Sequence, residues 1–144
     1  MNNPFQSYNI EYPKKYSNPV KSFCKTAGQN ESEEYAPFPR QVDLWYFCFL
    51  YAVNRNLEPS LDKEQSTNIT AASILSNDAY RIAHIQLVYL AKTESLVELV
   101  NHRAAMDYAN QMAAAGMPYV LQLLGDSDDL PINNLNAEIE SIKS

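Results

Sequence analysis

Glycine and cysteine are both scarce in this chain, and their scarcity excludes several kinds of protein. Three glycines among 144 residues are too few for the many tight turns of a β-sandwich or barrel, and no GxxxxGK or GxGxxG phosphate loop occurs. Cys24 and Cys48 are too few and too far apart for a disulfide framework, and there is no CxxC pair. The composition, with 46% hydrophobic residues, predicts one globular domain with reduced thiols and no nucleotide-binding loop.

An excess of positive charge is also missing. The formal net charge is −6, whereas non-specific nucleic-acid binding needs clustered lysine and arginine to displace counterions. A short basic strip does exist near the N-terminus, where tyrosines lie between Lys14, Lys15, Lys21 and Lys25. Solvated tail residues are the favoured interpretation of this strip, and contact with phosphates is the alternative. We expect nucleic acid to be reached only indirectly, through a complex.

Long hydrophobic runs and a secretory leader are absent as well. The segment from Asn2 to Tyr16 is polar and does not resemble a signal peptide. The longest apolar run, Leu44 to Val53, would extend for roughly 15 Å as a helix, which is about half of a bilayer core. We therefore expect a cytoplasmic protein with no membrane partner.

The residues that usually carry catalysis do not converge in the sequence. His84 and His102 fall on separate predicted helices, and neither has a histidine or glutamate partner at i+4. The acidic run Asp126 to Asp129 superficially resembles a calcium loop, but Leu130-Pro131 interrupts the alternation of ligands. The sequence thus predicts no catalytic residue, no cofactor and no metal site, and a chain that is not an enzyme.

Three strong helical periodicities predict an all-α fold, a compact bundle of four to five helices over residues 40–144. Apolar residues surround the whole of the first predicted helix, Arg40 to Asn56, so this helix should be central, although its aromatic residues leave a buried strand open. Residues 57–70 are expected to form a loop, and residues 69–75 a brief extended piece or one helical turn. Further helices are expected at 78–92, 93–100 and 128–142, together with one long helix at 101–124 that is broken at Gly116-Met117-Pro118, where Pro118 begins its second part.

Residues 1–39 are predicted to form a separate N-terminal arm that is extended or partly disordered. Five prolines recur in this arm and disfavour helix, and Thr26 to Glu34 is the best candidate for a flexible linker. Its aromatic residues are more numerous than a purely disordered segment would carry, so we expect the arm to lie against its own domain or a partner. Aromatic residues of the arm and of the first long helix are predicted to bind a partner: Tyr8, Tyr12, Tyr16, Phe23, Tyr46, Phe47 and Tyr51.

The order and spacing of the helical segments resemble a known family. The matching features are Asp43 to Val53, Ile85 to Lys92, the acidic joint Thr93 to Val100, Met106-Asp107-Tyr108-Ala109-Asn110, Gly116 to Leu124 and the Asp128 to Leu135 tail. In these features residues 40–140 resemble the small proteins associated with DNA phosphorothioation (Dnd) systems, of the associated-protein-four type, in prokaryotic antiphage defence islands. The resemblance implies an accessory role and offers no catalytic residues to carry over.

We therefore expect a non-catalytic accessory or adaptor subunit of a multi-protein antiphage defence complex, bound to a larger partner such as an ATPase or SMC-like subunit. A domain of this size has few helices with which to bury both faces of the Leu44 to Val53 helix, which favours a partner. Two other classes stay open: a small nucleic-acid-binding regulator that uses the lysine strip, and an effector nuclease with dispersed active-site residues. Homo-oligomerisation also stays open.

Overall fold

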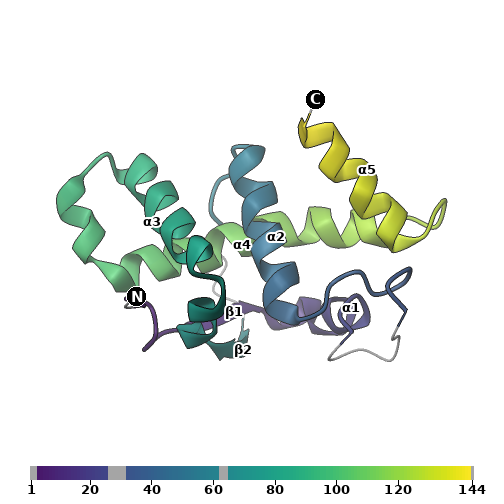
Figure 1. The fold of residues 1–144 in the computed structure, drawn as a ribbon, viewed down its shortest axis with the longest axis horizontal. Helices are drawn as coiled ribbons and strands as arrows, with labels where there is room; N and C mark the ends of the chain where they lie inside the picture. The colour runs from purple at the N-terminus through teal and green to yellow at the C-terminus, as the bar shows by residue number, and fades with distance from the viewer. Residues whose placement is uncertain (1–2, 26–31, 62–64, 144) are drawn as a thin grey trace.

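The computed structural model describes residues 3–25, 32–61 and 65–143, and these residues are mostly helical (Figure 1). The predicted helical fold is confirmed in its coarse form, but the fold is not purely α, because two strands pair as an antiparallel sheet. In chain order, with 3-10 helices labelled η, the elements are β1 (Asn9–Pro13), η1 (Lys14–Tyr16), α1 (Ser17–Ser22), α2 (Gln41–Asn54), β2 (Ser66–Ala71), η2 (Ala72–Asp78), α3 (Ala79–Thr93), η3 (Leu96–Val100), α4 (His102–Leu124) and α5 (Pro131–Lys143).

Helix α2 is the central element. It crosses the long helix α4, and α3 and α5 lie on either side of it (Figure 1). Leu44, Trp45 and Phe49 are fully buried, as expected of a helix that is apolar all round. The preference for helix over a buried strand in this segment is therefore confirmed. Gly116 of α4 lies at the crossing, where the two backbones come too close for a side chain.

Helix α4 is continuous from His102 to Leu124, so the predicted break at Gly116-Met117-Pro118 is wrong. The glycine was interpreted as a helix terminus and the proline as the start of a new helix. An internal proline removes one backbone hydrogen bond and costs about 3 kcal/mol. Burial of Met117 and Val120 on either side of Pro118 offsets this cost by packing the helix against the core.

The N-terminal segment is packed into the fold and is not a separate extended arm. Only β1 is an extended strand, and it is followed by η1 and α1. Strand β1 pairs with β2, so the predicted loop at 57–70 is wrong for its last residues. The segment supplies a set of fully or almost fully buried side chains to the common core: Phe5, Ile10, Tyr12, Val20 and Cys24. Residues 26–31 of the predicted linker and residues 62–64 of the predicted loop lie outside the described residues.

Asn110 of α4 holds β1 against the helices. Its side-chain oxygen accepts hydrogen bonds from the Glu11 backbone N–H at 3.0 Å and from Trp45 Nε1 at 3.1 Å. Its side-chain nitrogen donates to the backbone oxygen of Asn9 at 3.0 Å. One amide therefore joins β1, α2 and α4, and it pairs the indole N–H of Trp45, a fully buried residue, which would otherwise be left unpaired.

Candidate functional site

An apolar groove lies between α2 and α5, with one residue of α3 in its wall. Its cavity volume is about 500 Å³. Most of its walls are aliphatic or aromatic, and Asn54, His84 and the Tyr51 hydroxyl supply the polar groups. The lining residues are Phe47, Leu50, Tyr51, Val53, Asn54, His84, Ile139 and Ile142.

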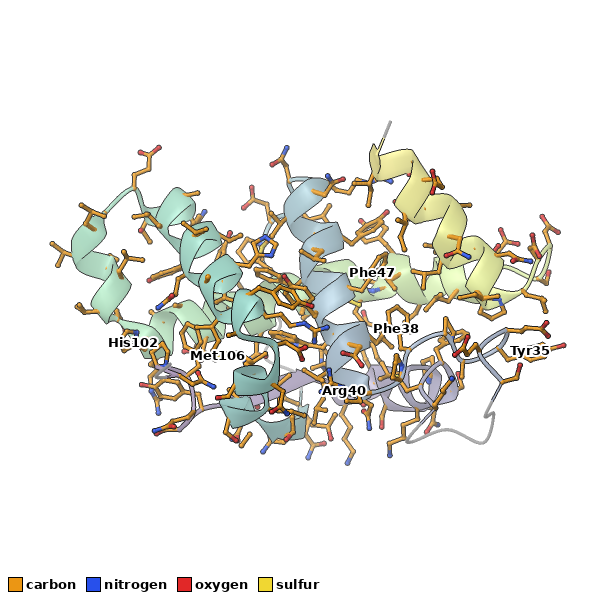
Figure 2. The ribbon with its side chains drawn as sticks, in the orientation of Figure 1. Tyr35, Phe38, Arg40, Phe47, His102 and Met106 are labelled. Carbon is orange, nitrogen blue, oxygen red and sulfur yellow. The ribbon has the colours of Figure 1, made fainter. Side chains whose placement is uncertain are left out.

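The two walls arise from the patterns of their helices. Because α2 is apolar all round, one face packs on α4, and Phe47, Leu50 and Tyr51 are left half-buried on the groove side. Figure 2 shows Phe47 on the side of α2 that faces α5. On α5, Leu135 is buried in the core, whereas Ile142, two turns further on, is 42% exposed. The apolar stripe of α5 therefore continues beyond the core and into the groove.

An ion pair joins the two walls. The Arg55 guanidinium, directly after α2, donates a hydrogen bond to the Glu138 carboxylate on α5. The same guanidinium lies 5.1 Å from the centroid of the Tyr51 ring, and that ring stacks on Tyr119 of α4 with centroids 6.0 Å apart. These contacts hold the Tyr51 side of the groove in a fixed position relative to α4 and α5.

His84 is the titratable group in the groove wall. Its Nδ1 lies 2.6 Å from the Tyr46 hydroxyl, and its ring is nearly perpendicular to the Tyr46 and Phe49 rings, with centroids 5.9 and 5.6 Å away. Burial lowers the pKa of His84 because the imidazolium form loses hydration. Burial likewise raises the pKa of Tyr46 to about 12, so its hydroxyl stays protonated. The neutral pair can share one O–H···N hydrogen bond, which leaves Nε2 of His84 for other contacts.

A buried arginine braces the α2 and α3 ends behind this pair. Arg81 is 8% exposed, its guanidinium carbon lies 4.4 Å from the Tyr46 ring centroid, and its Nη2 lies 3.1 Å from Asp43 Oδ1. Arg40 donates to the same carboxylate and to Asp78, at 2.8 and 3.0 Å. Burial raises the pKa of the Asp43 carboxyl, but the hydrogen bonds and charges of the two arginines outweigh burial and hold the pKa below its usual range.

The structure brings together only part of the set predicted to bind a partner. Phe47 and Tyr51 both line the groove. Tyr46 is buried behind it, and Tyr12, 2% exposed, is a core residue. The remaining three are half-buried against the core at sites away from the groove lining: Tyr8, Tyr16 and Phe23. The aliphatic groove residues of α5 were missed, although their spacing on one helical face was a usable signal.

A second exposed apolar surface lies on η3. Leu96, Val97 and Val100 are 74–76% exposed, and Leu87 of the neighbouring α3 is also exposed. This 3-10 helix contributes no residue to the lining of the α2–α5 groove. It is a protruding surface, in contrast to the α2–α5 groove.

The reactive side chains are poorly placed for chemistry. Cys24 and Cys48 are both fully buried, and burial raises the pKa of Cys24 to about 12. The described residues contain no group of three or more His, Cys, Asp or Glu side chains that could hold a metal ion. In the lysine strip, Lys25 is paired with Glu33 at 2.9 Å, while Lys14 and Lys21 are exposed.

Comparisons with protein-family models, with curated proteins and with solved structures found no match to this chain. Within the described ranges, no helix combines the length and the apolar character needed to cross a membrane.

Proposed function

We propose that this chain is a non-catalytic adaptor subunit, and that the α2–α5 groove receives an apolar segment of a larger partner protein. The observation that carries this proposal is the groove of about 500 Å³ whose walls include half-buried Phe47 and Tyr51. Aromatic residues in concave apolar surfaces are typical of the centres of protein interfaces.

The groove suits a helix better than an isolated small group. Two roughly apolar helical walls accept a third helix whose side chains at i, i+3 and i+4 enter the space between them. Each Leu, Ile or Phe side chain that the partner buries there contributes roughly 1.5–3 kcal/mol before the costs of association. Asn54 and the Arg55–Glu138 pair at the margin supply polar contacts around the apolar centre.

The wider role we propose is that of an accessory subunit in a prokaryotic antiphage defence complex. The resemblance of residues 40–140 to small Dnd-associated proteins supports this setting, in which the partner is a larger subunit such as an ATPase or SMC-like protein. The adaptor itself contributes binding surface, and nucleic acid is contacted through the complex.

Co-purification from the native locus tests the proposal. Ile142→Gln places a polar side chain in the groove at a position exposed enough to keep α5 folded. Leu96→Gln makes the same type of change on η3, outside the groove, and is the matched control. We expect the tagged wild-type chain and Leu96→Gln to recover the same partner, and Ile142→Gln to recover about a tenth as much or less.

Circular dichroism of both variants must show the wild-type helical content for the comparison to count. Equal partner recovery by wild type and Ile142→Gln would reject the groove as the binding site. Deletion of the N-terminal segment is unsuitable for this test because Phe5, Ile10 and Val20 belong to the core. Such a deletion would unfold the chain and remove partner binding for an unrelated reason.

A further inference from the structure

Two-thirds of the formal net charge lies in the C-terminal segment that forms α5 and the turn before it. Residues 126–143 carry five carboxylates and a single lysine, which accounts for −4 of the formal net charge of −6. Three of the acids, Asp126, Asp128 and Asp129, lie in the exposed turn that leads into α5. The α2 wall lacks such an excess, since Asp43 is its one acid and is paired with arginines.

The acids of the turn are not neutralised by neighbouring cations. Asp126 accepts from the Asp128 backbone N–H at 3.0 Å, and Asp129 accepts from Leu130 N and Asn133 Nδ2, both at 2.7 Å. These local bonds hold the carboxylates in place but leave their charge uncompensated, and no ion pair within the described part of the chain involves them. The hydrogen bonds from the Asn133 side chain and the Leu130 backbone lower the pKa of Asp129.

The apolar groove residues of this segment lie on α5, and the acidic turn lies directly before that helix. Ile139 and Ile142 line the groove near the end of α5, and Asp129 lies just before its first turn. Ile142 follows Asp129 by 13 positions, nearly all of them within α5, which corresponds to roughly 20 Å at the helical rise. A helix of about four turns lying along α5 would reach from the apolar groove to the acidic turn.

We propose that the occupant of the groove is a basic amphipathic helix of the partner, with an apolar stripe that enters the groove and lysine or arginine residues that face the acidic turn. This inference rests on the proposed function and adds the chemistry of the partner. Charge complementarity across an interface steers association and selects against partners of the wrong sign. A second copy of this chain is disfavoured as the occupant because it carries the same −6 charge.

Synthetic peptides test the inference on the intact chain. Two fluorescent peptides of about 18 residues share one leucine stripe at helical spacing and differ only in their flanking residues, lysine in one and glutamate in the other. We expect the lysine peptide to bind at least about tenfold more tightly at low salt, and to lose most of this advantage at about 0.5 M salt, where exposed charges are screened.

Two variants separate the charge from the groove. Asp126→Asn combined with Asp128→Asn and Asp129→Asn should weaken the lysine peptide about fivefold or more and leave the glutamate peptide unchanged or tighter. The neutral change Ile142→Gln should weaken both peptides, whereas Leu96→Gln should weaken neither. Together these results would support a basic helix in the groove.

The outcomes that overturn the inference differ from those that overturn the proposed function. Equal binding of the two peptides, with both lost in Ile142→Gln, would leave the groove as a binding site and reject the basic partner. No binding of either peptide, while the native partner still depends on Ile142, would also reject it. Lysine-peptide binding that is unaffected by Ile142→Gln would show adhesion to the acidic surface only, and would reject the inference as well.

Discussion

Gly116→Ala is expected to force apart the two central helices. A Cβ at this position would lie 2.2 Å from the carbonyl oxygen and 3.1 Å from the carbonyl carbon of Cys48, and both atoms belong to the α2 backbone. Ordinary contact begins near 3.4 Å, so the helices must separate by about 1 Å. No rotamer change can relieve the contact, because no flexible side chain is involved.

The magnitude follows from two opposing effects. Overpacking of a close-packed core costs about 1–3 kcal/mol, and a clash with backbone belongs at or above the upper end of that range. Alanine is a better helix former than glycine by about 1 kcal/mol, which offsets part of the cost. We expect a net loss of about 2 kcal/mol or more in the free energy of unfolding, which for a chain of this length lowers Tm by about 7 °C.

Thermal and urea unfolding followed by circular dichroism would measure this loss. Gly125→Ala is the matched control, because Gly125 caps α4 at an ordinary φ of −86° and its Cβ would lie 3.2 Å from the Leu121 carbonyl oxygen, a contact that a shift of a few tenths of an ångström would relieve. The free energy of unfolding of Gly125→Ala should differ from that of wild type by less than about 0.5 kcal/mol. A Gly116→Ala variant as stable as wild type would contradict the predicted backbone contact. Ala52→Gly removes only the 3.4 Å side-chain contact. Wild-type stability in the double variant Gly116→Ala/Ala52→Gly would therefore also contradict a contact with the α2 backbone.

Further predictions concern the pH dependence of stability, the reactivity of the two cysteines and the Asn110 side chain. Burial lowers the pKa of His84 below its ordinary value of 6.5. On acidification the unfolded chain therefore takes up the proton first, and the free energy of unfolding should fall below that pH. Urea titrations at pH 7 and 5.5 should show a smaller loss in His84→Gln than in wild type. The pKa of Asp43 is lowered, so a further loss should appear below its ordinary value of 3.8, and a flat profile there would contradict the arginine brace. Cys24 and Cys48 are fully buried and should react with a thiol reagent only after denaturation, and rapid labelling of the native chain would contradict their burial. Asn110→Ala leaves polar groups of β1 and Trp45 unpaired and should cost about 1–3 kcal/mol in urea unfolding, more than Asn110→Asp, which keeps the acceptor oxygen.

The helices could be predicted from the sequence because their signals are local. The apolar pattern of Gln41–Asn54 and the small-residue stripe of α4 each lie within one segment. Pro118 gave a misleading local signal, since its cost is offset by burial that only the folded chain reveals. The β1–β2 pairing could not be predicted, because Ile10 and its partner Thr70 are distant in sequence and each strand is short.

The groove was predictable only in part for a similar reason. Phe47 and Tyr51 were identified as partner-binding residues because they are large aromatics on a helix with too much apolar surface. Tyr12 is also a large aromatic residue, but it is buried, because the pairing of β1 with β2 places it in the core. Which aromatic residues remain accessible depends on where α5 and the N-terminal segment pack, and neither position is encoded in a single segment.

Helix α4 links the stability of the fold to the shape of the groove. Both groove walls are seated on it: α2 packs at Gly116, and α5 packs on α4 after the turn that follows Leu124. Between the walls themselves, Arg55–Glu138 is the ion pair found among the described residues. A shift of α2 by about 1 Å at Gly116 would therefore move the α2 wall relative to the α5 wall, because α5 has its own contacts with α4. Gly116→Ala should accordingly weaken the binding of a groove ligand at temperatures well below Tm, where the variant is still folded. Full binding under those conditions would mean that the groove shape is set independently of the α2–α4 crossing.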